Sequence, residues 1–89
     1  MKEIMVTIMN KCGIHLRPAS LFVQTAAAFN SEILIVKDGK SVSAKEIMNI
    51  IMLQSPKGTE LKIIANGADE DEALAAILDL VEVKTFNEE

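Results

Sequence analysis

The sequence is short of the residues that mark several classes of protein. Its one cysteine, Cys12, can form neither an internal disulfide framework nor a metal site with several cysteine ligands. It has no tryptophan or tyrosine, three phenylalanines and a net charge of −4. Because nucleic-acid binding normally requires basic surfaces, often with aromatic side chains, we expect no nucleic-acid partner.

Long apolar stretches are also missing. The longest uninterrupted apolar run covers six residues, 73–78, well short of a membrane span. The first residues lack the basic-then-apolar pattern of a signal peptide. We therefore expect a cytoplasmic protein with no membrane contact.

What is present is typical of a globular protein: 49% hydrophobic and 25% charged residues. A chain of 89 residues can bury one core but not two, which predicts a single domain over residues 1–89.

The spacing of apolar residues predicts the element order βαββαβα. Strands are expected at 4–8, 33–36, 41–43 and 61–65, and helices at 19–28, about 43–53 and from 69 onward. Asp38-Gly39 predicts a tight hairpin turn, which requires positive φ at both central residues. Four strands with helices between them indicate an α+β fold, an antiparallel sheet with one face covered. The last helix is expected to bury Leu74, Ile77, Leu78 and Val81.

The second helix is short and unusually apolar. Ser43 and Glu46 have the spacing of a capping box, which would start the helix there. Because two turns on a sheet can bury only one stripe, we assign Ile50 and Leu53 to the core. The alternative is a wholly buried helix. The remaining apolar side chains are expected to form an exposed patch: Ile47, Met48 and Ile51.

Candidate reactive groups are concentrated at the entrance to the first helix. The only histidine and the only arginine, His15 and Arg17, stand there, with Pro18 in the first turn. A helix N-terminus offers unpaired N–H groups and a positive dipole end, so it accepts anions such as phosphate. Arg17 adds a planar charged group suited to phosphate oxygens, and a neutral imidazole has a nitrogen free to attack phosphorus. The spacing alone does not distinguish this chemistry from an ordinary solvated turn.

Residues 13–20, GIHLRPAS, resemble the active-site signature of HPr, the histidine-containing phosphocarrier of the bacterial phosphoenolpyruvate-dependent sugar phosphotransferase system. The resemblance extends to residues 22–26, 44–45, 47–48 and 66–70. It implies an open-faced β-sandwich, in which a four-stranded antiparallel sheet of order 1-4-2-3 carries three helices on one face.

The resemblance also implies a function. His15 would accept a phosphoryl group from phospho-enzyme I, forming a phosphohistidine, and pass it to the A component of sugar permeases. Arg17 would stabilise charge, and the backbone N–H groups of Leu16 and Arg17 would hold the phosphoryl group. Whether the tele or the pros ring nitrogen is phosphorylated is left open.

Further expectations concern partners and cofactors. The patch of Ile47, Met48 and Ile51 corresponds to the family's docking surface, and transcriptional regulators are additional candidate partners. Such a carrier needs no cofactor and no metal, and it does not turn over a small substrate by itself. We expect it to be a monomer.

Some positions depart from the family pattern. Glu46 stands where many members carry a serine phosphorylated by a regulatory kinase, so that switch is absent here. The Glu46 carboxylate either imitates the phosphorylated state or only caps the helix. Leu16 is bulkier than the usual small residue, and Gln54 replaces a residue that is commonly glycine. These departures keep open an alternative, a non-transferring regulatory or adaptor module that docks partners through the second helix.

Overall fold

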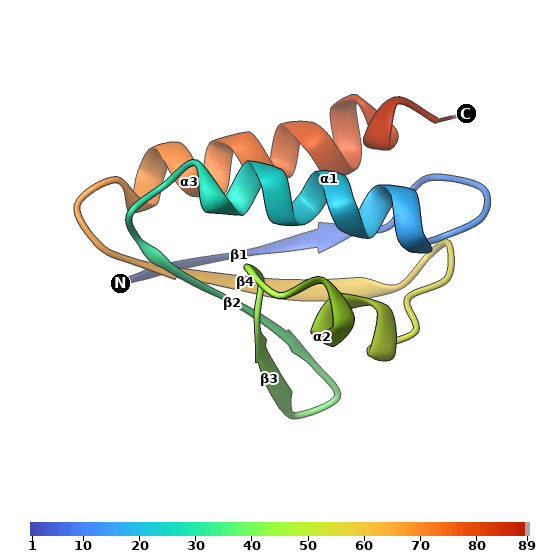
Figure 1. The fold of residues 1–89 in the computed structure, drawn as a ribbon, viewed down its shortest axis with the longest axis horizontal. Coiled ribbons are helices and arrows are strands. Elements are labelled where there is room, and N and C mark those ends of the chain that lie inside the picture. The colour runs from blue at the N-terminus through green and yellow to red at the C-terminus, as the bar shows by residue number, and fades with distance from the viewer. Residues whose placement is uncertain (89) are drawn as a thin grey trace.

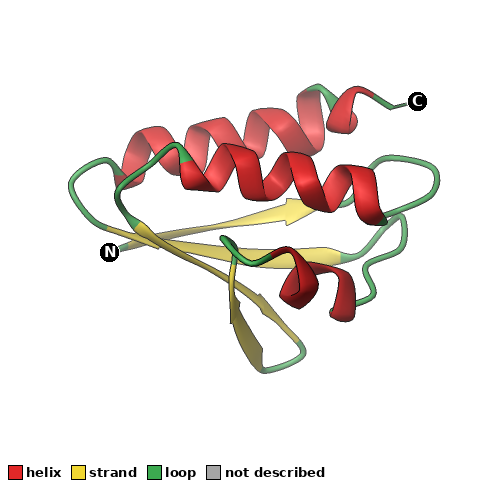
Figure 2. Ribbon diagram, viewed as in Figure 1, coloured by secondary structure: helices red, strands yellow, loops and turns green. Residues whose placement is uncertain are grey.

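Four strands form one antiparallel sheet in residues 1–88, the part of the chain that the computed structural model describes. Helices cover one face of this sheet, and the described residues contain three α-helices in the predicted βαββαβα order (Figures 1 and 2). The elements are β1 (Lys2–Thr7), α1 (Leu16–Ala27), β2 (Glu32–Lys37), β3 (Lys40–Ser43), α2 (Ile47–Met52), β4 (Glu60–Asn66) and α3 (Glu70–Leu78).

The strand order is β1-β4-β2-β3, as the resemblance implies. The last strand in the sequence therefore lies between the first two, and pairs antiparallel with both. The β2–β3 hairpin turns at Asp38 and Gly39, whose φ angles of 51° and 79° confirm the predicted tight turn. This order places the end of β1 beside the start of β4, so the two loops at that end of the sheet are neighbours.

The core lies between the sheet and the helices. Alternate strand residues are buried against α1 and α3, which lie side by side over the sheet (Figure 1). The fully or almost fully buried strand side chains are Val6, Ile33, Ile35, Leu61, Ile63 and Ala65. Met5 lies on the opposite face and is 53% exposed, so that face is open.

The third helix differs from its prediction in one buried residue, and the chain stays helical beyond its end. Leu78 is 39% exposed, whereas Leu74, Ile77 and Val81 are buried. Because Ala73 is buried as well, the apolar stripe is centred on Ile77 and Leu78 falls at its margin. Beyond α3 the chain continues as a π-helical segment, Asp79–Val83, and then a 3₁₀ turn, Thr85–Asn87.

The predicted capping box is wrong. α2 begins at Ile47 with Glu46 as its N-cap residue, and Glu46 makes no side-chain cap hydrogen bond. Ser43 belongs to β3, and its Oγ accepts a hydrogen bond from the Lys45 N–H at 3.2 Å. The helix starts later than a capping box at Ser43 requires because the Ala44 N–H still donates to Ile33 O of β2, at 2.9 Å.

The other elements agree with the sequence to within a few residues. α1 starts at Leu16 rather than Ala19; its first two residues, Leu16 and Arg17, are exposed and so do not belong to the apolar stripe that begins at Ala19. None of the helices in residues 1–88 combines the length and hydrophobicity that crossing a membrane requires.

Candidate phosphoryl-acceptor site

His15 is the N-cap residue of α1, at the end of the loop that follows β1. Its backbone is extended, with φ −118° and ψ −162°, and its carbonyl accepts a hydrogen bond from the Ala19 N–H at 3.0 Å. Its side chain is 47% exposed. The imidazole therefore stands at the mouth of the helix and is open to solvent.

The first turn of α1 supplies hydrogen-bond donors beside this ring. The N–H groups of Leu16 and Arg17 have no acceptor within the helix, and α1 has no side-chain cap that would occupy them. Pro18 follows and has no N–H to satisfy. The twelve residues of α1 direct the positive end of their dipole toward the same point, which favours an anion there.

The Arg17 side chain turns toward the C-terminal end of the chain. Its Nη1 donates to Phe86 O at 3.1 Å and to Glu88 Oε2 at 3.3 Å. The Arg17 side chain is still 55% exposed. The structure therefore places His15 and Arg17 beside the same carboxylate, Glu88, and adds acceptors that the sequence reasoning did not identify.

Glu88 is a residue of the site that the sequence analysis did not identify. Its Oε2 lies 3.2 Å from His15 Nε2, and its Oε1 lies 3.4 Å from the same nitrogen. Oε1 also accepts a hydrogen bond from Asn10 Nδ2 at 3.0 Å. Desolvation alone would raise the pKa of Glu88, but hydrogen bonds from Asn10, His15 and Arg17 outweigh it and hold the pKa below its ordinary value. No local sequence signal indicates this contact, because 73 residues separate Glu88 from His15.

The loop that carries His15 is held by a second missed residue, Asn10. Asn10 is fully buried and its Nδ2 donates to Gly13 O at 2.6 Å. The next residue, Ile14, donates its N–H to Ser55 O at 2.9 Å. These bonds fix the backbone immediately before His15, so the position of the ring is set by buried contacts rather than by an unsupported turn.

A surface hollow extends from His15 toward α2. Its lining comes from the N-cap residue of α1, from exposed and half-buried residues of α1 and from one residue of α2: His15, Leu16, Arg17, Ser20, Leu21, Gln24 and Ile47. Leu16 is 67% exposed, so its bulk stands at the rim and does not cover the ring. His15 and Ile47 of α2 thus line one continuous hollow.

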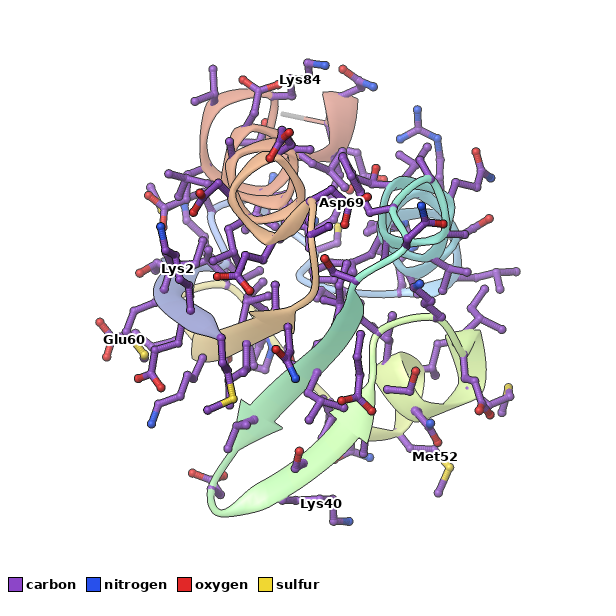
Figure 3. The ribbon with its side chains drawn as sticks, turned by 90° about the vertical axis from the view of Figure 1, so that its left-hand side faces the viewer. Lys2, Lys40, Met52, Glu60, Asp69 and Lys84 are labelled. Atoms are coloured by element: carbon purple, nitrogen blue, oxygen red, sulfur yellow. The ribbon has the colours of Figure 1, made fainter. Side chains whose placement is uncertain are left out.

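α2 presents its apolar side chains largely as predicted. Ile50 and Leu53 are buried, and Met48 is 60% exposed. Ile47 and Ile51 are partly buried against the core, so they contribute edges rather than whole side chains to the patch. Met52, which was not included in the predicted patch, is exposed and points away from the molecule (Figure 3).

Two further residues discussed from the sequence, Cys12 and Glu46, lie in the segments that flank the site. Cys12 is exposed in the loop before His15, and its side chain is a free thiol. Glu46 is exposed at the start of α2. Within residues 1–88, no three His, Cys, Asp or Glu side chains are grouped so that they could hold a metal ion.

Similarity to known proteins agrees with this geometry. A protein-family model described as the PTS HPr component phosphorylation site matches residues 2–83. The chain belongs to the HPr family. The residues matched include the whole sheet, the three α-helices and the His15 site, so the HPr assignment covers the domain and not only its signature.

Individual HPr relatives are similar over most of their length. The phosphocarrier protein HPr of Neisseria meningitidis serogroup A is 42% identical over 76 residues, 85% of each chain. The HPr-like protein Crh of Bacillus subtilis is 49% identical over 69 residues, 78% of this chain and 81% of Crh. A crystal structure of HPr from Thermoanaerobacter tengcongensis has a TM-score of 0.94 at 50% identity and covers 100% of this chain and 99% of that one. An HPr dimer from the same organism aligns with a TM-score of 0.75, covering 96% and 98% of the two chains.

Proposed function

We propose that the chain is a phosphoryl carrier of a phosphotransferase system, with His15 as the acceptor. The observation that carries the proposal is an exposed imidazole at the N-terminus of a twelve-residue helix, with Arg17 beside it. Unpaired N–H groups, the helix dipole and a guanidinium converge where a phosphoryl group on His15 would lie. Phosphoryl transfer depends mainly on such positioning and charge stabilisation.

The proposed step exchanges one phosphorus–nitrogen bond for another. The lone pair of one ring nitrogen of His15 forms the new bond to phosphorus. The bond to the donor's histidine breaks, and its electron pair stays on the donor nitrogen. The donor ring, already protonated on its other nitrogen, leaves as a neutral imidazole, while His15 keeps its ring proton and becomes a phosphorylated imidazolium. Charge and protons therefore balance without a co-reactant.

The proposed partners follow from this role. The donor is phospho-enzyme I and the acceptor is the A component of a sugar permease, with transcriptional regulators as further partners. Docking uses the face that joins the His15 hollow to Ile47, Met48 and Ile51 of α2. Exposed methionine suits a surface with more than one partner because its side chain repacks readily. We also propose that the protein is cytoplasmic and works without a cofactor, a metal or turnover of a small substrate.

The test is incubation of the chain with phosphoenolpyruvate and purified enzyme I, followed by measurement of bound phosphate. We expect an acid-labile, base-stable adduct, which is the stability of a phosphohistidine, and its loss in His15→Ala. An absent adduct, or an equal adduct in the variant, would reject His15 as the acceptor.

A second candidate is an HPr-like adaptor that docks partners without transferring phosphate. It is favoured by the exposed Glu46, a fixed negative charge beside the docking surface where a phosphorylatable serine is common. Replacing Glu46 with Ser tests whether this charge imitates a phosphorylated serine. If the charge imitates a phosphorylated state, transfer from enzyme I becomes faster in the variant; equal rates reject the imitation.

Monomeric state is a separate proposal. A net charge of −4 on a chain of this size opposes self-association through general repulsion. Sedimentation equilibrium is expected to give the mass of one chain, and the mass of two chains would contradict the proposal.

A further inference from the structure

Two buried polar side chains, Asn10 and Ser55, each carry an oxygen atom that the contacts described above leave unpaired. Asn10 is fully buried and Ser55 is 3% exposed. Within residues 1–88, neither Asn10 Oδ1 nor Ser55 Oγ has a hydrogen-bond partner. A buried polar atom without a partner destabilises the fold, so such atoms are nearly always satisfied by the protein or by an ordered water molecule.

The two side chains come from segments that are bonded to each other, the loop of residues 8–15 that carries His15 and the turn of residues 55–59 before β4. Both segments lie at the end of the sheet where α1 begins (Figure 1). Three backbone hydrogen bonds join them: Ile8 N–H to Thr59 O at 2.8 Å, Gly58 N–H to Ile8 O at 2.7 Å and Ile14 N–H to Ser55 O at 2.9 Å.

Asn10 and Ser55 approach the same residue, Gly13, within this junction. Asn10 Nδ2 donates a hydrogen bond to Gly13 O at 2.6 Å. Gly13 packs directly on the turn, because a Cβ built on it would lie 2.6 Å from Ser55 O. The two unpaired oxygens therefore belong to residues on either side of one glycine.

The orientation of the Asn10 amide is set by its neighbours. Its Nδ2 faces two acceptors, Gly13 O at 2.6 Å and Glu88 Oε1 at 3.0 Å. A flipped amide would place an oxygen against both acceptors, so the unpaired atom is the oxygen, which can only accept. The Ser55 hydroxyl can both donate and accept. A water molecule between them can therefore donate to Asn10 Oδ1 and accept from Ser55 Oγ.

We propose that Asn10 Oδ1 and Ser55 Oγ bind one internal water molecule, which joins the loop carrying His15 to the turn before β4. A buried water needs at least two polar partners, and these two side chains supply them. The water satisfies both oxygens at once and adds a further link beside the backbone bond from Ile14 to Ser55 O. This site is independent of the proposed carrier function, since it uses none of the groups that would meet the phosphoryl group.

The sign of one stability change tests the proposal. Ser55→Ala removes only the hydroxyl and leaves the water and Asn10 Oδ1 short of a partner. The unfolding equilibrium constant, measured with urea, is expected to rise about fivefold. A hydroxyl buried without any partner would act in the opposite direction, because its removal relieves a penalty. An unchanged or lowered constant therefore overturns the proposal.

The matched control is Ser41→Ala, at an exposed serine of β3. Its unfolding constant is expected to stay within about twofold of the parent value. A rise as large as that of Ser55→Ala would show that loss of a hydroxyl is costly anywhere in this chain, and would overturn the assignment to a buried site.

A double-mutant cycle tests whether the two side chains share the water. Asn10→Ala also removes the bonds of Nδ2, but this cost is present with and without Ser55→Ala and so cancels in the cycle. Because the bridge is already lost in Asn10→Ala, adding Ser55→Ala is expected to change the unfolding constant by less than about twofold. The same fivefold rise in both backgrounds would overturn the shared site.

High-resolution crystallography locates the water directly and decides the matter if Asn10→Ala does not fold. The parent chain is expected to show one water within about 3.2 Å of both Asn10 Oδ1 and Ser55 Oγ, and Ser55→Ala is expected to lose it. A parent structure without this water, or with Ser55 Oγ bonded directly to protein, overturns the proposal. None of these measurements uses enzyme I, so failure of the carrier function and failure of the water site are observed separately.

Discussion

At the scale of single residues, the site depends on Gly13, where any side chain would meet neighbouring backbone. Gly13 has a φ of 69°, and a Cβ built there would lie 2.6 Å from Ser55 O and 2.7 Å from Pro56 Cα. Both neighbours are backbone atoms, so they cannot move aside as a side chain would. The close approach lets Ile14 bond to Ser55 O and brings the His15 loop against the turn before β4.

Gly13→Ala is therefore expected to lower the free energy of unfolding by about 2 kcal/mol and to slow phosphoryl transfer to His15. Urea unfolding and the rate of transfer from enzyme I measure the two effects. Gly39→Ala is the matched control, since Gly39 also has positive φ, 79°, but nothing lies within 4 Å of its Cβ position. Its cost is expected to be about 1 kcal/mol, from conformation alone, with no change in transfer. Equal effects of the two substitutions would contradict the close-packing account.

Some residues of the site could be predicted from the sequence and others could not. His15 and Arg17 are identifiable because both are unique in the chain and stand at a helix start. Asn10 and Glu88 are not, because their roles depend on tertiary contacts. Glu88 reaches the site only through the left-handed turn at residues 85–87, and a run of positive φ at Thr, Phe and Asn has no sequence signature comparable to glycine.

At the scale of elements, α2 shows how a short helix divides its side chains between core and surface. Met48 and Met52 are exposed, at 60% and 70%, while Ile50 anchors the helix. The apolar pattern of the sequence correctly assigned Ile50 and Leu53 to the core. The predicted start of α2 was wrong because the backbone hydrogen bond from Ala44 to β2 competes with helix formation. The spacing of a capping box carries no information about such a distant partner.

Met48→Asp is expected to leave the fold intact and to lower kcat/KM for phosphoryl transfer from enzyme I by about tenfold, because a charge would be buried in the docking surface. Transfer kinetics and thermal unfolding measure the two effects. Met5→Asp is the control, since Met5 is 53% exposed on the other face of the sheet. If both substitutions, or neither, slow transfer, α2 is not the docking element.

The end of α2 contains a residue in a conformation that favours glycine. Gln54 has a φ of 53°, and its N–H donates to Ile51 O at 3.2 Å, which closes the last turn. Lys37 Nζ supports the same end by donating to Leu53 O at 2.6 Å. Glycine adopts this conformation without the strain that a Cβ brings.

Gln54→Gly should therefore raise the free energy of unfolding by about 0.5 kcal/mol, the relief of left-handed strain less the greater freedom of glycine in the unfolded chain. Denaturant unfolding gives the value. Gln54→Ala keeps the Cβ and is expected to bring no gain, so a gain equal to that of glycine would show that strain at this residue is not the cause.

At the scale of the whole molecule, one carboxylate joins two distant connections. Asp69, between α3 and α1 (Figure 3), accepts hydrogen bonds from the N–H groups of Asn30 and Ser31 at 2.8 and 2.9 Å. The Ser31 hydroxyl also donates to it. These bonds, led by the one from the Ser31 side chain, hold the pKa of Asp69 below its ordinary value. The link fastens the α1–β2 connection to the start of α3.

Acid should therefore weaken the fold. A carboxylate with a depressed pKa in the folded state stabilises the protein above its ordinary pKa and loses that contribution as the pH falls through the folded value. Since the pKa values of Asp69, Glu70 and Glu88 are all lowered, stability is expected to be level above about pH 5 and to decline below it. Asp69→Asn should be less stable at pH 7 and show a shallower decline, measured by urea unfolding across this range. An unchanged decline would exclude Asp69 as a source of the acid sensitivity.

The architecture was more predictable than the site. Alternating residues such as Leu61, Ile63 and Ala65 predict a half-buried strand, and Asp38-Gly39 predicts the β2–β3 hairpin, because these are local consequences of backbone geometry. The strand order is not local, since β4 enters between β1 and β2, and it came from the family resemblance. The same distinction explains why the C-terminal contact with His15 could not be foreseen.

The central claim is that His15 receives and releases a phosphoryl group while the rest of the molecule keeps its fold. Its most direct test is the ¹H–¹⁵N spectrum of the His15 ring, recorded before and after phosphoenolpyruvate and enzyme I, and again after addition of a permease A component. We predict that the ring resonances shift on phosphorylation, identify the nitrogen that carries phosphorus, and return to their starting positions when the acceptor is added. Ring resonances that stay unchanged, in a chain that remains folded and in the presence of active enzyme I, would contradict the account.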